Sequence, residues 1–222
     1  MCKFKSGIIL KDRVFVPDHD HHTQMLEELG IEDTSRNAET LFVRFELRPL
    51  GDDTFSDIDT WEFKVDQDII PEEWFVKDYE KGRAREAVKL WAKEHINIDK
   101  DGLELREGTH YIKDCKNVVL RGGSTVDTMF GSSTVNMMYG RSTVNKMYGS
   151  STVNEMYGKS TVNEMYGGSA VNKMYGKSTA ITHALHDIGK PKALILSDNS
   201  TFKDNKNKVI YQSGDWQLVS VK

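Results

Sequence analysis

A nine-residue repeat runs from Gly123 to Gly176, and no other feature of the sequence constrains the fold as strongly. The unit x-Ser-Thr-Val-Asn-x-Met-Tyr-Gly continues through six blocks without an insertion. Valine recurs at the same place in each block, at Val126, Val135, Val144, Val153, Val162 and Val171. Methionine does the same, at Met129, Met138, Met147, Met156, Met165 and Met174. Self-similarity at one fixed period predicts a solenoid of stacked, equivalent units.

The residue types of the unit favour strands over helices. Each block holds a β-branched Thr-Val pair, and a glycine in every block would cost a helix about 1 kcal/mol each time. We expect Ser-Thr-Val-Asn-x to form a strand and Met-Tyr-Gly-x to form the corner, where glycine supplies a positive φ. Two strands and two corners need two blocks, so we predict a two-sided roll of about 18 residues per coil. Residues 123–176 then make about three coils, which neighbouring segments extend.

Side chains alternate along a strand, and this alternation assigns the faces of the roll. With valine pointing inward, serine joins it inside, while threonine and asparagine point outward. Methionine folds back into the core from the corner. Equivalent residues stack from coil to coil, so we expect outer ladders of asparagine and of tyrosine. The candidate binding surface is therefore the tyrosine series Tyr139, Tyr148, Tyr157, Tyr166 and Tyr175.

The flanking segments predict an α+β domain before the solenoid and a β-rich cap after it. We place the domains at 1–104 (α+β), 105–189 (β-solenoid, with the repeat core at 123–179) and 190–222 (C-terminal β cap). Alternating apolar residues predict strands at 41–47 and 61–65, and residues 4–10 and 13–16 predict a hairpin. Helices are expected over 22–29, ended by Gly30, and from about Tyr79 to His95. Strands in the C-terminal segment would cap the last coil, because exposed sheet edges aggregate.

Charge is divided unevenly along the 222 residues. Residues 1–122 hold 19 Lys/Arg and 27 Asp/Glu, a net charge of −8, whereas residues 123–222 hold 11 and 7, a net charge of +4. Five basic residues in the repeat are interleaved with three acidic ones, so we expect no basic stripe. Nucleic acid is left open as a partner, and the acidic front half could face a basic protein.

The sequence predicts a protein of the reducing cytoplasm. No window approaches the roughly 20 apolar residues of a membrane span, so no membrane partner is expected. The start has only three apolar residues in a row, shorter than the core of a secretory signal. Cys2 and Cys115 lack the spacing of a zinc site or a disulfide framework.

The segment Asp18-His19-Asp20-His21-His22 is the densest group of metal-ligand types. Alternate residues of an extended segment share a side, so Asp18 with Asp20, or His19 with His21, could meet one metal ion. The alternative is a polar loop in which Asp20 caps the following helix. The spacing matches no standard site, and we predict neither a bound metal nor a cofactor.

Cys2 suggests an enzymatic alternative. Removal of Met1 would leave an N-terminal cysteine whose α-amine, with a pKa near 8, could act as its base. His21 is a candidate partner for such a nucleophile. The start resembles that of N-terminal-cysteine amidotransferases and abasic-site crosslinking proteins, which begin Met-Cys-Gly, but Lys3 replaces the glycine here.

Two further motif matches depart from their families. The repeat is similar in length to calcium-binding β-rolls, but Asp127 is the single aspartate in its six blocks. His186-Asp187 resembles the His-Asp motif of HD phosphohydrolases, an all-helical fold whose upstream histidine is missing between Tyr111 and Thr182. We treat this second match as chance.

A broader resemblance involves Met1-Cys2-Lys3-Phe4, the stretch 17–33 and the stretch 61–68. These segments resemble uncharacterised proteins of bacteriophages and gut bacteria that also carry short Ser/Thr-Val nonapeptide repeats. The resemblance implies a setting and no known activity. It places the protein in the cytoplasm of a bacterial host.

Three functions follow as hypotheses. The first is a non-enzymatic interaction or scaffold protein, in which the rigid solenoid binds or sequesters a protein partner or self-associates through its caps as a homo-oligomer. The second is an enzyme with Cys2 as its nucleophile. The third is a structural spacer without a site.

Overall fold

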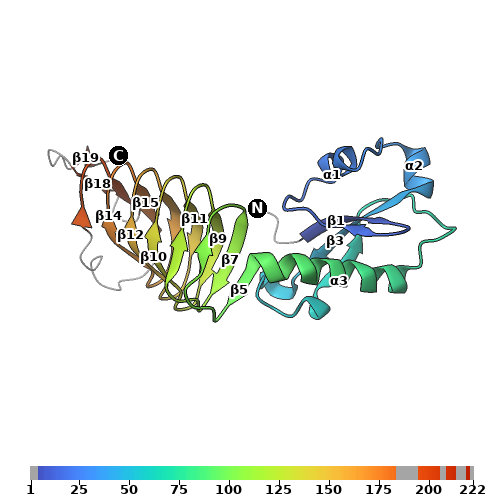
Figure 1. Cartoon of the computed structure of the whole chain (residues 1–222), viewed down its shortest axis with the longest axis horizontal. Coiled ribbons are helices and arrows are strands. Elements are labelled where there is room, and N and C mark those ends of the chain that lie inside the picture. The colour runs from blue at the N-terminus through green and yellow to red at the C-terminus, as the bar shows by residue number, and fades with distance from the viewer. Residues whose placement is uncertain (1–4, 184–194, 206–208, 214–218, 221–222) are drawn as a thin grey trace. The chain divides into compact units, whose positions relative to one another are not determined.

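The computed structural model describes residues 5–183, 195–205, 209–213 and 219–220. The chain forms two compact units, Met1–Glu94 and His95–Lys222. The first is a small α/β unit and the second is a β-solenoid (Figure 1). The expected order of an α+β region, a solenoid and a β-rich end is thus confirmed.

The described residues of the N-terminal unit form a four-stranded antiparallel sheet with three helices. The strands are β1 (Lys5–Leu10), β2 (Val14–Phe15), β3 (Phe42–Arg48) and β4 (Glu62–Val65), in the order β2-β1-β3-β4. The helices are α1 (His22–Glu28), α2 (Ser35–Thr40) and α3 (Lys77–His95), with short 3-10 turns η1 (Leu50–Asp52) and η2 (Ile58–Thr60). Both the expected hairpin and the two longer expected helices are present.

Strand β1 is buried along its whole length because the sheet is covered on both faces. Ile8 and Leu10 pack with Met25 and Leu26 of α1 in one apolar cluster. On α3, the buried residues Ala84, Val88 and Ala92 recur every four residues, as expected of a helix with one face on a core. Gly30 has a φ of +68° just after α1, which confirms its role as the helix stop.

The solenoid has about five coils with a spacing of about 18 residues between residues 96 and 204. One parallel sheet contains β6 (Glu104–Leu105), β8 (Val118–Leu120), β10 (Thr134–Met138), β12 (Thr152–Met156), β14 (Ala170–Met174) and β16 (Ile195–Leu196). The other contains β5 (Ile96–Ile98), β7 (Thr109–Lys113), β9 (Thr125–Phe130), β11 (Thr143–Met147), β13 (Thr161–Met165), β15 (Thr179–Thr182) and β17 (Thr201–Asp204). Consecutive strands therefore alternate between the sheets, and each pairs with the strand two places away, as in Val135 with Val153.

The last coil ends in antiparallel pairing. Strand β17 pairs with β18 (Val209–Gln212), and β18 pairs with β19 (Val219–Ser220). The edge of this sheet is therefore an antiparallel strand, on which the solenoid cannot continue with another parallel coil. At the other end, β5 and β6 already belong to the two solenoid sheets, so the solenoid begins before the expected boundary at residue 104.

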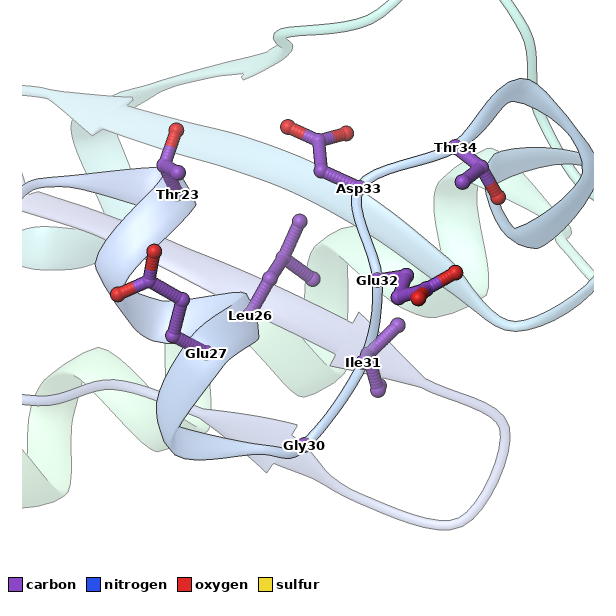
Figure 2. Close-up of a pocket in the computed structure, with 8 residues that line it drawn as sticks. All are labelled: Thr23, Leu26, Glu27, Gly30, Ile31, Glu32, Asp33 and Thr34. Carbon is purple, nitrogen blue, oxygen red and sulfur yellow. The ribbon is translucent and has the colours of Figure 1, made fainter.

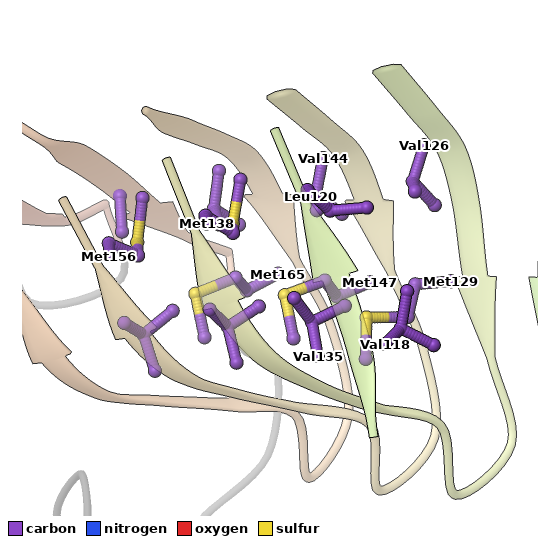
Figure 3. Packing of buried hydrophobic residues seen from close by; sticks show 14 of the residues in the cluster. Val118, Leu120, Val126, Met129, Val135, Met138, Val144, Met147, Met156 and Met165 are labelled. Atoms are coloured by element: carbon purple, nitrogen blue, oxygen red, sulfur yellow. The ribbon is translucent and has the colours of Figure 1, made fainter. Parts of the chain in front are cut away.

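Serine, valine and methionine of the repeat fill the interior. Val144, Met147 and Ser142 have no exposed surface, and their equivalents in the other blocks are buried alike, apart from the partly buried Ser169. Figure 3 shows the valine and methionine side chains lying between the two sheets. The expected assignment of inward and outward residues is correct for these positions.

The boundary between strand and corner differs from the expectation. Each full repeat strand runs from threonine to methionine, and the corner is Tyr-Gly-x-Ser. Valine and methionine are both buried although they lie three positions apart, so the two residues between them, asparagine and the variable residue, both face outward. The ladder register accordingly pairs Val144 with Val162 and Lys146 with Glu164, and passes over the asparagine between them. Strict alternation could not show this local irregularity.

Candidate functional site

The aromatic side chains form two separate stacks, because residues 18 apart occupy the same place in successive coils. Tyr139, Tyr157 and Tyr175 stack at one corner, with ring centroids 5.2 and 4.9 Å apart and planes within 12°. The other corner holds Phe130, Tyr148, Tyr166 and His183, at spacings of 6.3, 5.1 and 5.7 Å. The tyrosine series named from the sequence is therefore divided between the two corners.

Stacking restricts what these rings can bind. A ring in the middle of a stack has a neighbour against each face, so it offers a partner its edge and its hydroxyl group. The tyrosines are only partly exposed. A planar ligand could stack on a terminal ring alone, and a row of bases or sugars could not interleave with the ladder.

Glutamates at the variable position of the repeat accept hydrogen bonds from two tyrosine hydroxyl groups. Tyr157 donates to Glu155 Oε2 at 2.5 Å, and Tyr166 donates to Glu164 Oε2 at 2.8 Å. Lys173, one coil further on, binds Glu155 at 3.0 Å. The Glu155 carboxylate raises the pKa of Tyr157 to about 12, and the hydrogen bonds from Tyr157 and Lys173 lower the pKa of Glu155.

Asparagine side chains form two further ladders on the outside of the roll. Asn154 donates to Asn136 at 3.1 Å and Asn172 donates to Asn154 at 3.0 Å on one sheet. Asn163 donates to Asn145 at 3.0 Å on the other. Amide ladders of this kind tie each coil to the next and confirm the expected outer asparagine rows.

A row of cations at one corner went unrecognised in the sequence. The first residue of each block alternates between neutral and basic, in the order Ser132, Arg141, Ser150, Lys159, Gly168, Lys177. Because alternate blocks form opposite corners, Arg141, Lys159 and Lys177 lie together, beside the Tyr139 stack, and all three are exposed. The expectation that no basic stripe forms is wrong. The signal was present as an 18-residue period in charge, which a nine-residue reading hides.

The Asp18–His22 segment is divided among separate partners. His19 contacts Glu28 at 3.0 Å, His22 contacts Asp66 at 3.2 Å, and Asp20 binds Lys5 at 2.9 Å. Within the described part of the chain, no group of three or more His, Cys, Asp and Glu side chains is placed to hold a metal ion. The five candidate residues thus do not form one ligand set.

Asp20 does not cap helix α1. The N-cap residue is His21, and it makes no side-chain cap hydrogen bond. Asp20 instead accepts from the backbone N–H of Ser6 at 3.0 Å and from the Lys5 ammonium group. Its carboxylate therefore joins the segment to strand β1, and the helix-capping interpretation was wrong.

Of the residues that bear on the cysteine hypothesis, the structure describes His21 and Cys115. Cys2 lies outside the described residues, as does the His186-Asp187 pair. His21, its candidate partner, is exposed and its backbone N–H donates to the His19 ring at 3.3 Å. Cys115 is buried in the first coils, where loss of solvent raises the pKa of its thiol, so it is an inert core residue.

A shallow pocket in the N-terminal unit is lined by acidic side chains. It lies between α1 and the segment that follows it (Figure 2), and its lining includes Leu26, Glu27, Ile31, Glu32 and Asp33. Asp33 also forms an ion pair with Arg44. The lining residues include neither a nucleophile with a base nor a phosphate-binding loop, so the pocket supports no catalytic interpretation.

Helices able to cross a membrane do not occur among the described residues. No protein-family model, curated protein or solved structure matches the chain. The candidate site therefore rests on the geometry of the solenoid corner alone.

Proposed function

We propose that this chain is a non-enzymatic binding protein that uses its β-solenoid as a rigid scaffold to hold or sequester a partner. The observation that carries the proposal is the inequality of the two corners. A spacer needs only the buried serine, valine and methionine of each block. The outward position instead alternates between Ser132 or Ser150 and Arg141 or Lys159, so one corner has cations at a position where the other has uncharged residues.

A solenoid suits this role because each coil repeats the same side chains at a fixed distance. A partner that contacts one coil meets the same groups in the next, so weak contacts add along the axis. The proposal places the protein in the cytoplasm of a bacterial host, in the bacteriophage and gut-bacterial setting that its N-terminal segments resemble. Self-association through the solenoid ends is part of it, and a native mass spectrum of the full chain measures that state.

Site-directed photo-crosslinking in bacterial cells tests the proposal. A photoreactive phenylalanine analogue replaces Tyr157 at the charged corner, Tyr148 at the other corner, or the exposed Tyr79 in the N-terminal unit. We expect a discrete crosslinked product from Tyr157, because its ring edge faces outward beside Lys159. Products from Tyr79 alone, or from none of the three positions, would favour the spacer.

The enzymatic alternative is tested separately. Intact mass spectrometry shows whether Met1 is removed and whether Cys2 carries an adduct. Retention of Met1 would exclude a nucleophile assisted by its own α-amine.

A further inference from the structure

The three basic residues occupy one position in consecutive coils. The backbone N–H groups of Arg141, Lys159 and Lys177 donate to the carbonyls of Gly122, Gly140 and Gly158, at 2.8, 2.8 and 2.7 Å. Each bond links a coil to the one before it at the same place. Since neighbouring strands lie about 4.8 Å apart, the three residues form a straight row about 10 Å long. We call this row the basic edge.

The surroundings leave the basic edge with its positive charge. None of its three residues forms an ion pair with a residue that the structure describes. Glu155, an acid on the adjoining strand β12, is already bound by Lys173 and Tyr157. A carboxylate at the C-terminal end of the row, Asp198, accepts from the backbone N–H of Gly176.

Arg121 lies one coil before Tyr139, and its charge is paired. Its guanidinium group lies 5.0 Å from the centre of the Tyr139 ring and 3.0 Å from Glu104. The equivalent corner on the other side of the roll carries Ser132, Ser150 and Gly168, which have no charge. The row of cations is therefore present at one of the two corners of the solenoid and absent from the equivalent position of the other.

We propose that the basic edge binds the phosphodiester backbone of single-stranded nucleic acid, without regard to base sequence. This inference deepens the proposed function and rests on it. Three cations in a straight line require a partner whose anions also recur at short intervals along a line. A single nucleic acid strand has one charge per nucleotide in its backbone and can straighten to follow the row.

Two other polyanions fit the row less well. In an extended peptide, successive side chains point to opposite faces, so only every second acid of an acidic run could face the row. The backbone of a duplex is rigid and winds away from a straight line. Readout of bases by stacking is excluded for the inner tyrosines, because their faces cover one another.

Fluorescence anisotropy with a labelled 20-nucleotide oligothymidylate, at several sodium chloride concentrations, tests the inference on the full chain. With three phosphate contacts, the logarithm of the binding constant should fall with the logarithm of salt at a slope of about −2. The variant Arg141→Ser, Lys159→Ser, Lys177→Ser adopts the residue found at the opposite corner. It should bind roughly a hundredfold more weakly at low salt and lose most of the slope.

A matched control removes three charges elsewhere in the solenoid unit: Lys116→Gln, Lys146→Gln and Lys203→Gln. This variant should keep most of the affinity. Equal weakening of both variants would overturn the inference, since binding would then follow total charge.

A third variant guards against simple loss of folding. Adding Ser132→Lys, Ser150→Lys and Gly168→Lys to the serine variant moves the row to the opposite corner. Gly168 accepts a side chain because its φ is not positive and a Cβ there meets no atom closer than 3.5 Å. Binding of oligothymidylate should return. A folded variant that does not bind it would contradict the inference that three aligned cations are sufficient for binding.

The outcomes separate this inference from the proposed function. If oligothymidylate fails to bind while polyglutamate binds at the basic edge, the partner is an acidic protein and the nucleic acid inference is wrong. If neither binds while Tyr157 still crosslinks to a partner, the proposed function stands without the basic edge. If Tyr157 gives no crosslink and neither polyanion binds, both are wrong.

Discussion

At the scale of single residues, the corner glycines are the positions that tolerate the least change. Gly149 has a φ of +69°, and a Cβ placed on it would lie 2.8 Å from the carbonyl oxygen of Gly131. The left-handed conformation and the close approach of the neighbouring coil both exclude a side chain. Gly168, one residue past such a corner glycine, meets neither restriction.

We therefore expect Gly149→Ala to destabilise the solenoid by at least about 1–2 kcal/mol, the cost of the left-handed conformation. Gly168→Ala is the matched control and should leave the stability unchanged or raise it by a few tenths of a kcal/mol. Urea unfolding followed by circular dichroism measures both. Similar midpoints for the two variants would show that the corner relaxes to accept a Cβ.

Tyr157 provides a second prediction at this scale. Its neutral form donates to Glu155, so the pKa of Tyr157 is raised to about 12 in the folded protein, against about 10 in an unfolded chain. The folded state thus holds its proton at higher pH. The stabilisation is complete below about pH 10 and is lost as the pH rises toward 12.

Absorbance titration of the tyrosines tests the Tyr157 assignment. Glu155→Gln should lower the pKa of Tyr157 toward 10, whereas Glu107→Gln, at an exposed site far along the sequence, should leave the titration curve unchanged. Subtraction of a Tyr157→Phe curve isolates the residue. An unchanged pKa in Glu155→Gln would mean that the carboxylate is not the cause of the shift.

At the scale of strands and coils, the structural unit is 18 residues although the sequence unit is nine. Adjacent blocks have almost the same sequence, yet they belong to different sheets and make different corners. The serine hydroxyls show the difference. The hydroxyl groups of Ser133 and Ser151 each donate to a carbonyl at 2.8 Å. The hydroxyl groups of Ser142 and Ser160 are buried with no hydrogen bond to the described residues.

Deletions distinguish the two units. Removal of residues 141–158 takes out one whole coil, so every later strand keeps its sheet and the protein should retain cooperative thermal unfolding. Removal of 141–149 moves every later strand to the opposite sheet together with the terminal hairpin, so the strands before the deletion pair with strands of the other corner type. We expect this variant to melt at least several degrees lower or to aggregate.

Circular dichroism melts and size-exclusion chromatography compare the two deletions. Equal stability would show that strands of the two corner types pair with each other equally well. Both deletions remove Arg141, but the longer one keeps Lys159 and Lys177 at their corner, whereas the shorter one transfers them to the opposite corner.

At the scale of the whole molecule, charge is divided between the two units. Residues 1–94 hold 14 Lys/Arg and 22 Asp/Glu, a net charge of −8, and residues 95–222 hold 16 and 12, a net charge of +4. The net positive charge of the solenoid unit is modest, but three of its cations are aligned at one corner. A partner meets three adjacent cations at one corner, and uncharged residues at the equivalent places of the other.

The stability of the solenoid as a body can be followed through Cys115. Its side chain is fully buried, its sulfur donates to the carbonyl of Asn97 at 3.3 Å, and burial raises the pKa of the thiol. In a Cys2→Ser variant, we expect a disulfide reagent to react with Cys115 only when the first coils open. The rate should increase steeply with urea, and rapid labelling without denaturant would contradict a closed core.

The amino-acid pattern was sufficient for much of this fold, and the reason is local. A glycine in every block, a β-branched pair and an apolar Val and Met dictate short strands, tight corners and an inward face wherever the chain lies. The same reasoning identified the hairpin of the N-terminal unit and the helix that Gly30 ends. It placed the outer asparagine and tyrosine ladders because stacking repeats whatever one coil exposes.

Other features depended on which residues the coils bring together across space. The contact between Asp20 and Lys5 depends on how the loop before α1 returns to β1, which sequence spacing does not determine. From spacing alone, Asp20 was expected to cap the helix, and this cap does not form. The division of five tyrosines into two stacks and the alignment of Arg141, Lys159 and Lys177 arise because a coil contains two blocks. Neighbours in the sequence are then separated by the core, and residues 18 apart become neighbours about 4.8 Å apart.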